Sequence, residues 1–298
     1  MRILKKIYQK TRHMLEMIRF SHTVFALPFA LIALLTALAS LPSGYLLLKV
    51  LAAMVFARSA AMTFNRILDL PFDRFNPRTK TRHLVTGTIS LPLAWFFFAV
   101  TTLGFVVSAR SINALAGLLS WPVLAILFFY SFTKRFTAYS HVVLGFCLSL
   151  APLGAWVAAT GEVSWRAFPL ALAVLLWVAG FDIIYATQDE AYDRQATLHS
   201  AVVRFGKTRA LYLARTFHML VVPALVLYGR LNPILGVYFY GAIAFIAALL
   251  LYEHRLVTPE SDLRRLNDAF FVVNGVIAVV LLLATCLDLA HKGRFVIL

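Results

Sequence analysis

Apolar runs of about 20 residues recur along this 298-residue chain, with short polar segments between them. A helix of that length crosses the hydrocarbon core of a bilayer. Backbone amides inside a bilayer must be hydrogen-bonded internally, so helices or closed barrels are the folds open to such a chain. The chain is 61% hydrophobic, whereas soluble domains are nearer half apolar. We therefore expect one all-α, polytopic membrane domain covering residues 1–298.

Nine runs are long enough to form transmembrane helices. The predicted spans are residues 20–39, 45–68, 91–108, 113–133, 140–159, 165–186, 209–228, 234–253 and 267–289. The first follows a basic N-terminus, as in a signal peptide, but it is long for one and more spans follow directly. We interpret it as an uncleaved first helix.

The net charge of +15 would suggest nucleic-acid binding in a soluble protein. Here the charges are confined to the segments between apolar runs, where the positive-inside rule applies. Twenty Lys and Arg residues fall on the N-terminal side of the membrane and six on the other side. This predicts no nucleic-acid partner, a cytoplasmic N-terminus and, after nine helices, an external C-terminus, in a bacterial inner membrane.

The first polar motif follows the second predicted span and contains Asn65, Asp69 and Asp73. Residues spaced by four share one face of a helix, provided that the helix continues past Pro71. Two carboxylates and an amide oxygen are ligands that suit Mg²⁺, which leaves positions free for substrate phosphates. The motif therefore predicts a Mg²⁺ site on the cytoplasmic side.

The second motif contains Asp182, Asp189 and Asp193 at the end of the sixth span, with Asp182 on nearly the same helical face. Asp69 and Asp189 are 120 residues apart, as are Asp73 and Asp193. The repeat predicts two related halves around a central cavity, where two metal ions would clamp one diphosphate. The alternative is that these acids are loop charges that offset nearby arginines.

Several basic residues each allow two interpretations, one structural and one functional. Lys134 and Arg135 end the fourth span, either as interfacial anchors or as diphosphate ligands. Arg58 lies deep in the second span, where cavity lining is favoured over snorkelling because an isolated membrane arginine is costly. Arg19 either anchors the first helix or receives the carboxylate of an acidic acceptor.

Together these residues resemble the UbiA-type superfamily of membrane aromatic prenyltransferases over nearly the whole chain. The pattern Asn-x-x-x-Asp-x-x-x-Asp is met by Asn65, Asp69 and Asp73. The pattern Asp-x-x-Tyr-Ala-x-x-Asp-x-x-x-Asp is met by Asp182, Tyr185, Ala186, Asp189 and Asp193. The pattern Tyr-x-x-x-Lys-Arg is met by Tyr130, Lys134 and Arg135.

The resemblance implies a Mg²⁺-dependent transfer of a polyprenyl group from its diphosphate to an aromatic acid. It implies catalytic roles for Asp182 and Tyr185, and substrate contacts for Tyr130 and Arg78. The 4-hydroxybenzoate branch of ubiquinone-type biosynthesis is the most similar. That branch often has Arg-Pro-Leu-Pro-Ser-Gly where this chain has residues 82–87, Arg-His-Leu-Val-Thr-Gly. A dihydroxynaphthoate acceptor of menaquinone biosynthesis therefore stays an alternative.

A transporter is the alternative of another class, because Arg58 and Asp182 are suited to an ion pathway. Against it, the spans lack paired Gly/Pro breaks near the middle of the membrane, and the acids gather at one membrane face. A phosphatidyl-type transferase would need an Asp-Gly…Ala-Arg…Gly pattern, which the sequence lacks. The sequence favours an enzyme.

Overall fold

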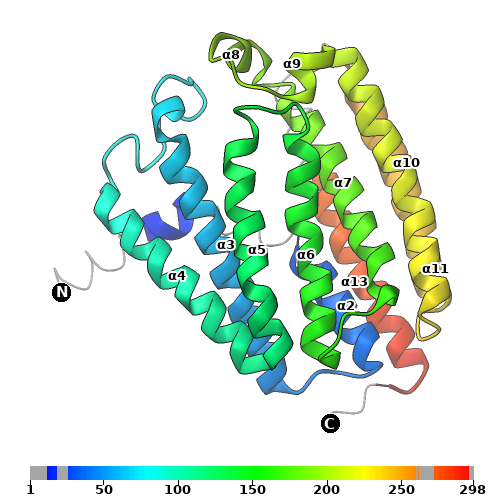
Figure 1. Ribbon diagram of the computed structural model, residues 1–298. Helices are drawn as coiled ribbons and strands as arrows, with labels where there is room; N and C mark the ends of the chain where they lie inside the picture. Colours follow the sequence, from blue (N-terminus) through cyan, green and yellow to red (C-terminus); the bar gives the residue numbers. More distant parts are fainter. Residues whose placement is uncertain (1–11, 19–25, 260, 262–271, 295–298) are drawn as a thin grey trace.

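The computed structural model describes residues 12–18, 26–259, 261 and 272–294, and over those residues its regular structure is helical (Figure 1). Within them, eight segments are long and apolar enough to cross a membrane. They are α3 (Gly44–Asp73), α4 (Leu91–Ile112), α5 (Ala114–Thr133), α6 (Ser140–Thr160), η2 (Trp165–Ala167) continuing into α7 (Phe168–Ala186), α10 (Lys207–Leu231), α11 (Val237–Leu256) and α13 (Asn274–His291). The shorter apolar helix α2 (Leu27–Leu38) has 12 residues. The predicted all-α, multi-span fold is confirmed.

Several helix boundaries differ from the prediction, by up to five residues. Helix α3 continues five residues beyond Leu68, with Pro71 inside it, since a proline this close to a helix end removes only one hydrogen bond. Of the predicted first span, the structure describes α2, while residues 20–25 of that span lie outside the described part. The last span is described from Asn274 onward within α13.

Helix α7 lies between α6 and α10 and is the most deeply buried span (Figure 1). Gly145 permits the approach of α6, because a Cβ at that position would lie 2.3 Å from the carbonyl oxygen of Leu175. On another side of α7, the ring of Trp177 packs 5.0 Å from Phe29 of α2, centroid to centroid. Helix α7 is therefore fixed on several sides before its polar end is reached.

The longer connections gather at one end of the bundle, which we call the loop end (top of Figure 1). It comprises residues 74–90, residues 134–139 and residues 187–206, the last with α8 (Glu190–Gln195) and α9 (Ala201–Phe205). The opposite end has short turns at residues 39–43, 113, 161–164 and 232–236. The helix ends that carry both acidic motifs therefore meet at the loop end.

A buried polar network joins α7, α10, α11 and α13. Trp177 Nε1 donates to Asn274 Oδ1 (2.6 Å), and Asn274 Nδ2 donates to Glu253 Oε1 (3.0 Å). His218 Nδ1 lies 3.3 Å from Glu253 Oε2. Polar groups inside a membrane protein are costly unless they are paired, so this network ties four helices together.

Candidate active site

One cavity of about 270 Å³ at the loop end is lined by both acidic motifs. The continuous helix α3 keeps Asn65, Asp69 and Asp73 on one face, and all three line the cavity. Asp73 is buried, at 7% exposure. The predicted stacking of this motif is therefore present, and Pro71 does not interrupt it.

The second motif reaches the same cavity by a different path from the one predicted. Helix α7 ends at Ala186, and Asp189 lies in the turn that precedes α8. Beyond Ala186 the backbone N–H groups of Thr187, Gln188 and Asp189 donate to the carbonyls three residues earlier, so the α-helical pattern gives way to a turn. The expectation of one helical face through Asp182, Asp189 and Asp193 is wrong, although all three line the cavity.

Basic side chains from the segment between α3 and α4 pair with the acids. Arg78 donates from Nε and Nη2 to the two carboxylate oxygens of Asp189, at 2.8 and 2.7 Å. Arg82 forms an ion pair with Asp73. Sequence reasoning missed Arg82; its signal was an arginine four residues after Arg78 in the same polar segment. The bidentate geometry fixes this segment across the cavity.

The other predicted basic and aromatic residues also line the cavity. Lys134 Nζ lies 3.9 Å from Asp193 Oδ2. Arg135 Nη2 donates to the carbonyl of Leu68 (3.0 Å), so it also holds the end of α5 against α3. Tyr130 lines the cavity from α5, and Tyr185 lies beneath the guanidinium of Arg78, 5.7 Å from ring centroid to Cζ.

Asp182 has a partner that sequence reasoning overlooked. His141, in the first turn of α6, is 1% exposed, and its Nδ1 lies 2.7 Å from Asp182 Oδ2. The backbone N–H of Ala201 donates to His141 Nε2 (3.4 Å), so Nδ1 carries the proton and donates to Asp182. The available signal was a histidine on the membrane side where the acids gather. His141 therefore orients the Asp182 carboxylate.

The oxygen donors of this cavity fit Mg²⁺. Hard oxygen ligands come from the last turns of α3 and from α8 with the turn before it: Asn65, Asp69, Asp73, Asp189 and Asp193. Asp193 Oδ2 is buried and receives no hydrogen bond from the described residues. Burial raises the pKa of Asp193. Burial lowers the pKa of Lys134, but the carboxylate of Asp193 and its neighbours outweigh this, so the net pKa shift is upward.

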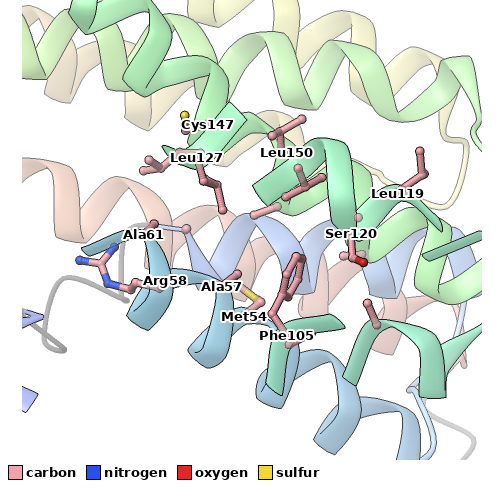
Figure 2. A pocket seen from close by; sticks show the side chains of 18 of the residues that line it. Met54, Ala57, Arg58, Ala61, Phe105, Leu119, Ser120, Leu127, Cys147 and Leu150 are labelled. Carbon is pink, nitrogen blue, oxygen red and sulfur yellow. The ribbon is translucent and has the colours of Figure 1, made fainter. Parts of the chain in front are cut away.

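A second cavity, of about 240 Å³, lies between α3, α4, α5 and α6 and has an apolar wall (Figure 2). Arg58 lies at one end, and Leu119 and Ser120 lie toward the other. The two cavities share a wall, formed by Arg58, Met62, Asn65, Tyr130, Leu144 and Leu148. The acidic cavity therefore adjoins an apolar one, and Arg58 lies at their boundary, as expected for a cavity-lining arginine. Arg19 lies outside the described residues.

The structure therefore places a charged cavity beside an apolar one inside a bundle of membrane-length helices. The chain belongs to the UbiA prenyltransferase family, which it matches over residues 26–286. The resemblance deduced from the motifs is thereby confirmed, and the chain is an integral, multi-pass membrane protein.

Relatives and solved structures agree with this membership. The 4-hydroxybenzoate octaprenyltransferase of Nitrosospira multiformis is 33% identical over 76% of this chain and 77% of its own. That of Pseudomonas aeruginosa is 36% identical over 67% of each chain. A UbiA homolog from Aeropyrum pernix K1 matches with a TM-score of 0.81 and 32% identity, covering 90% of this chain and 98% of its own.

A UbiA homolog from Archaeoglobus fulgidus, bound to GPP and Mg²⁺, has a TM-score of 0.72 and 20% identity. It covers 93% of this chain and 99% of its own, which shows a shared fold.

Proposed function

We propose that this protein transfers a polyprenyl group from polyprenyl diphosphate to the ring of an aromatic acid, with 4-hydroxybenzoate as the acceptor, in ubiquinone-type quinone biosynthesis. The adjacency of the acidic and apolar cavities, which have six lining residues in common, carries this proposal. A polyprenyl diphosphate has an anionic head and an apolar tail, and each end finds a matching environment. Family membership favours this reaction over transport.

The acidic cavity would hold the diphosphate head. Asn65, Asp69, Asp73, Asp189 and Asp193 would hold Mg²⁺, which neutralises a leaving diphosphate when bound. Lys134, charged beside Asp193, contributes a cation at the same place. Arg78 and Arg135 border the cavity and, with Arg82, orient the segments around it.

The apolar cavity would hold the first units of the prenyl tail. Its walls come from four helices, so the tail is shielded from water where the allylic carbon meets the acidic cavity. Tyr130 borders both cavities. Exclusion of water there favours attack by the aromatic ring over hydrolysis of the donor.

Asp182 is our candidate for activating the acceptor. One oxygen receives the hydrogen bond from His141, which leaves the other to accept from the phenol hydroxyl. The electron-rich ring carbon then forms a bond to the allylic carbon, the C–O bond to diphosphate breaks, and the ring proton passes to the released diphosphate, which restores the aromatic ring. Tyr185, one helical turn further along α7, faces the same cavity and is assigned to acceptor orientation.

Acceptor identity is proposed from relatives, two of which are named 4-hydroxybenzoate octaprenyltransferases. Arg58, at the boundary between the cavities, is the described cation best placed to receive an acceptor carboxylate. The sequence also predicted that Arg19 receives the acceptor carboxylate; since Arg19 lies outside the described residues, this stays a prediction. We further propose that the loop end faces the cytoplasm of a bacterial inner membrane, because the Lys and Arg bias selects that side.

A direct assay tests the proposal. Purified protein receives Mg²⁺, a polyprenyl diphosphate and, in parallel, 4-hydroxybenzoate, a dihydroxynaphthoate and benzoate. Mass spectrometry should find a C-prenylated 4-hydroxybenzoate. A prenylated naphthoate alone would reassign the acceptor. Diphosphate release without any prenylated aromatic product would overturn the proposal.

A further inference from the structure

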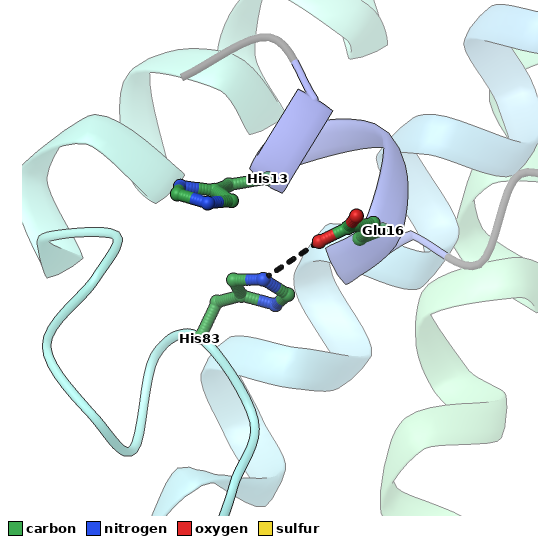
Figure 3. Close-up of side chains that lie close together, drawn as sticks. All are labelled: His13, Glu16 and His83. Carbon is green, nitrogen blue, oxygen red and sulfur yellow. Dashed lines mark hydrogen bonds and ion pairs between the residues drawn. The ribbon is translucent and has the colours of Figure 1, made fainter. Parts of the chain in front are cut away.

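His13, Glu16 and His83 converge outside the acidic cavity, where the helix of residues 12–17 meets the segment between α3 and α4 (Figure 3). Their ligand atoms lie within 4.8 Å of one another. In the part of the chain that the structure describes, no other group of three or more His, Cys, Asp or Glu side chains gathers so closely. Two imidazoles and one carboxylate form a donor set typical of zinc sites.

The spacing of these groups approaches coordination geometry. Zn–N and Zn–O bonds of about 2.0–2.1 Å place neighbouring ligand atoms of a tetrahedral site about 3.3 Å apart. His83 Nε2 lies 3.2 Å from Glu16 Oε2. The rings of His13 and His83 have centroids 5.2 Å apart and are tilted by 37°, so the His13 ring has to turn toward the other two groups to complete the set.

The backbone under these side chains is fixed by packing. His13 and Glu16 are three residues apart and so share one face of their helix. Met17 and Ile18, which follow them, are buried against α3 and against Leu84, the neighbour of His83. Apolar contacts therefore bring the two parts of the site together.

Glu16 is also held in a ligand-like orientation. Arg12 Nε donates to Glu16 Oε1 (2.8 Å), which leaves Oε2 directed at His83. Carboxylates that bind metals are commonly oriented by such a second hydrogen bond. A hydrogen bond between His83 and Glu16 accounts for the positions of those two side chains, whereas a metal site accounts for the convergence of all three.

We propose that His13, Glu16 and His83 bind a divalent transition metal, with Zn²⁺ as the preferred ion. Imidazole ligands distinguish this site from the all-oxygen acidic cavity, which suits Mg²⁺. The bound ion joins the helix of residues 12–17 to the segment that carries Arg78 and Arg82. The ion stabilises the position of that segment, and this proposal does not depend on the proposed enzymatic function.

Co²⁺ is the probe for the first test, because its visible absorption separates imidazole-containing tetrahedral sites from octahedral oxygen sites. Tag-free, full-length protein is stripped of metal, supplied with excess Mg²⁺ and titrated with Co²⁺. One equivalent of Co²⁺ should give the tetrahedral spectrum, and Zn²⁺ should displace it.

Four variants decide the assignment. His13→Ala and His83→Ala should weaken Co²⁺ binding by at least about 100-fold, beyond the loss typical of an outer-sphere partner. His199→Ala, which changes an exposed histidine at the loop end, should bind as the wild type does. The double variant Asp69→Asn/Asp189→Asn should keep the tetrahedral spectrum. Loss of the spectrum in the double variant, or its persistence without His13 and His83, would overturn the proposal.

Hydrogen exchange gives a second readout that does not rely on colour. Zn²⁺ should slow amide exchange in residues 12–18 of the wild type and leave it unchanged in His83→Gln, whose side chain can still hydrogen-bond Glu16. Equal slowing in both proteins would show that Zn²⁺ acts elsewhere. Wild-type exchange in His83→Gln without metal would confirm that the variant is folded.

Discussion

Asp69 and Asp182 line the same cavity, but their surroundings differ. Asp69 belongs to the oxygen cluster of α3, whereas Asp182 is held by His141. Asp69→Asn keeps the side-chain size and removes one negative charge, so we expect at least about a 100-fold loss of rate together with weakened donor binding. Asp182→Asn should retain donor binding and lose transfer to the ring.

Donor affinity and product partition, measured in both variants, test this difference. Asp182→Asn should release some prenyl alcohol, because the donor still ionises but the ring no longer captures it. If Asp182→Asn loses donor binding as severely as Asp69→Asn, Asp182 belongs to the diphosphate site and its assignment to the acceptor is wrong.

His141 is expected to act through Asp182. Removing the ring in His141→Phe leaves Asp182 without its hydrogen bond, so kcat should fall by about 10-fold or more while the KM for the donor stays near its wild-type value. Combined with Asp182→Asn, it should cost little more than Asp182→Asn alone. Additive losses in that double-variant cycle would show that His141 acts independently of Asp182.

The carboxylates of the acidic cavity also predict how metal removal changes the rate of prenyl transfer. A chelator should abolish transfer, and Mg²⁺ alone should restore it, because the acidic cavity supplies oxygen ligands. The assay is product formation after chelation and Mg²⁺ repletion, with no transition metal added. Full turnover after exhaustive metal removal would contradict the role given to Asp69, Asp73, Asp189 and Asp193.

Among the elements, the contact of α6 with α7 has the tightest backbone approach that bears on the site. Gly145→Ala would place a Cβ 2.3 Å from the Leu175 carbonyl oxygen, so the helices must separate. Overpacking of this kind typically costs about 1–3 kcal/mol. Thermal unfolding in detergent should show a lower Tm for Gly145→Ala.

Gly154→Ala is the matched control on the same helix, since a Cβ there would meet no atom within 4 Å. It adds the same methyl group and the same gain in helix propensity. The control should leave the Tm unchanged or raise it slightly. Equal destabilisation by both variants would mean that the close approach at Gly145 does not matter.

The elements also show what the sequence could predict. Hydrophobic runs predicted the spans well, because length and apolarity alone define them. The end of α7 at Ala186 was not predictable from the spacing of Asp182 and Asp189, since that spacing is equally compatible with a continuous helix and with the turn that the backbone forms at residues 187–189. His141 was missed because its importance comes from a residue 41 positions away. Motifs predicted which residues gather; pairings such as Arg82 with Asp73 required the fold.

At the scale of the whole molecule, orientation is the main prediction. The loop end holds the segments richest in Lys and Arg, which the positive-inside rule assigns to the cytoplasm. A reporter inserted near Asn76 should be cytoplasmic, and one fused after Leu298 should be external. Activity-based reporters of opposite compartment preference at both positions provide the measurement. Both reporters on one side would rule out the nine-span topology.

The shared wall between the cavities has a consequence for how the two proposed substrates meet. Under the proposed function the donor comes from the bilayer and the acceptor from water, and the reacting ends of both would lie in the acidic cavity beside the apolar one. The allylic carbon of the donor would lie near the residues that the two cavities share, among them Arg58 and Tyr130. The product would keep the prenyl tail and lack the diphosphate, so it would partition into the bilayer. The proposed reaction would therefore move a soluble aromatic acid into the bilayer and leave it there.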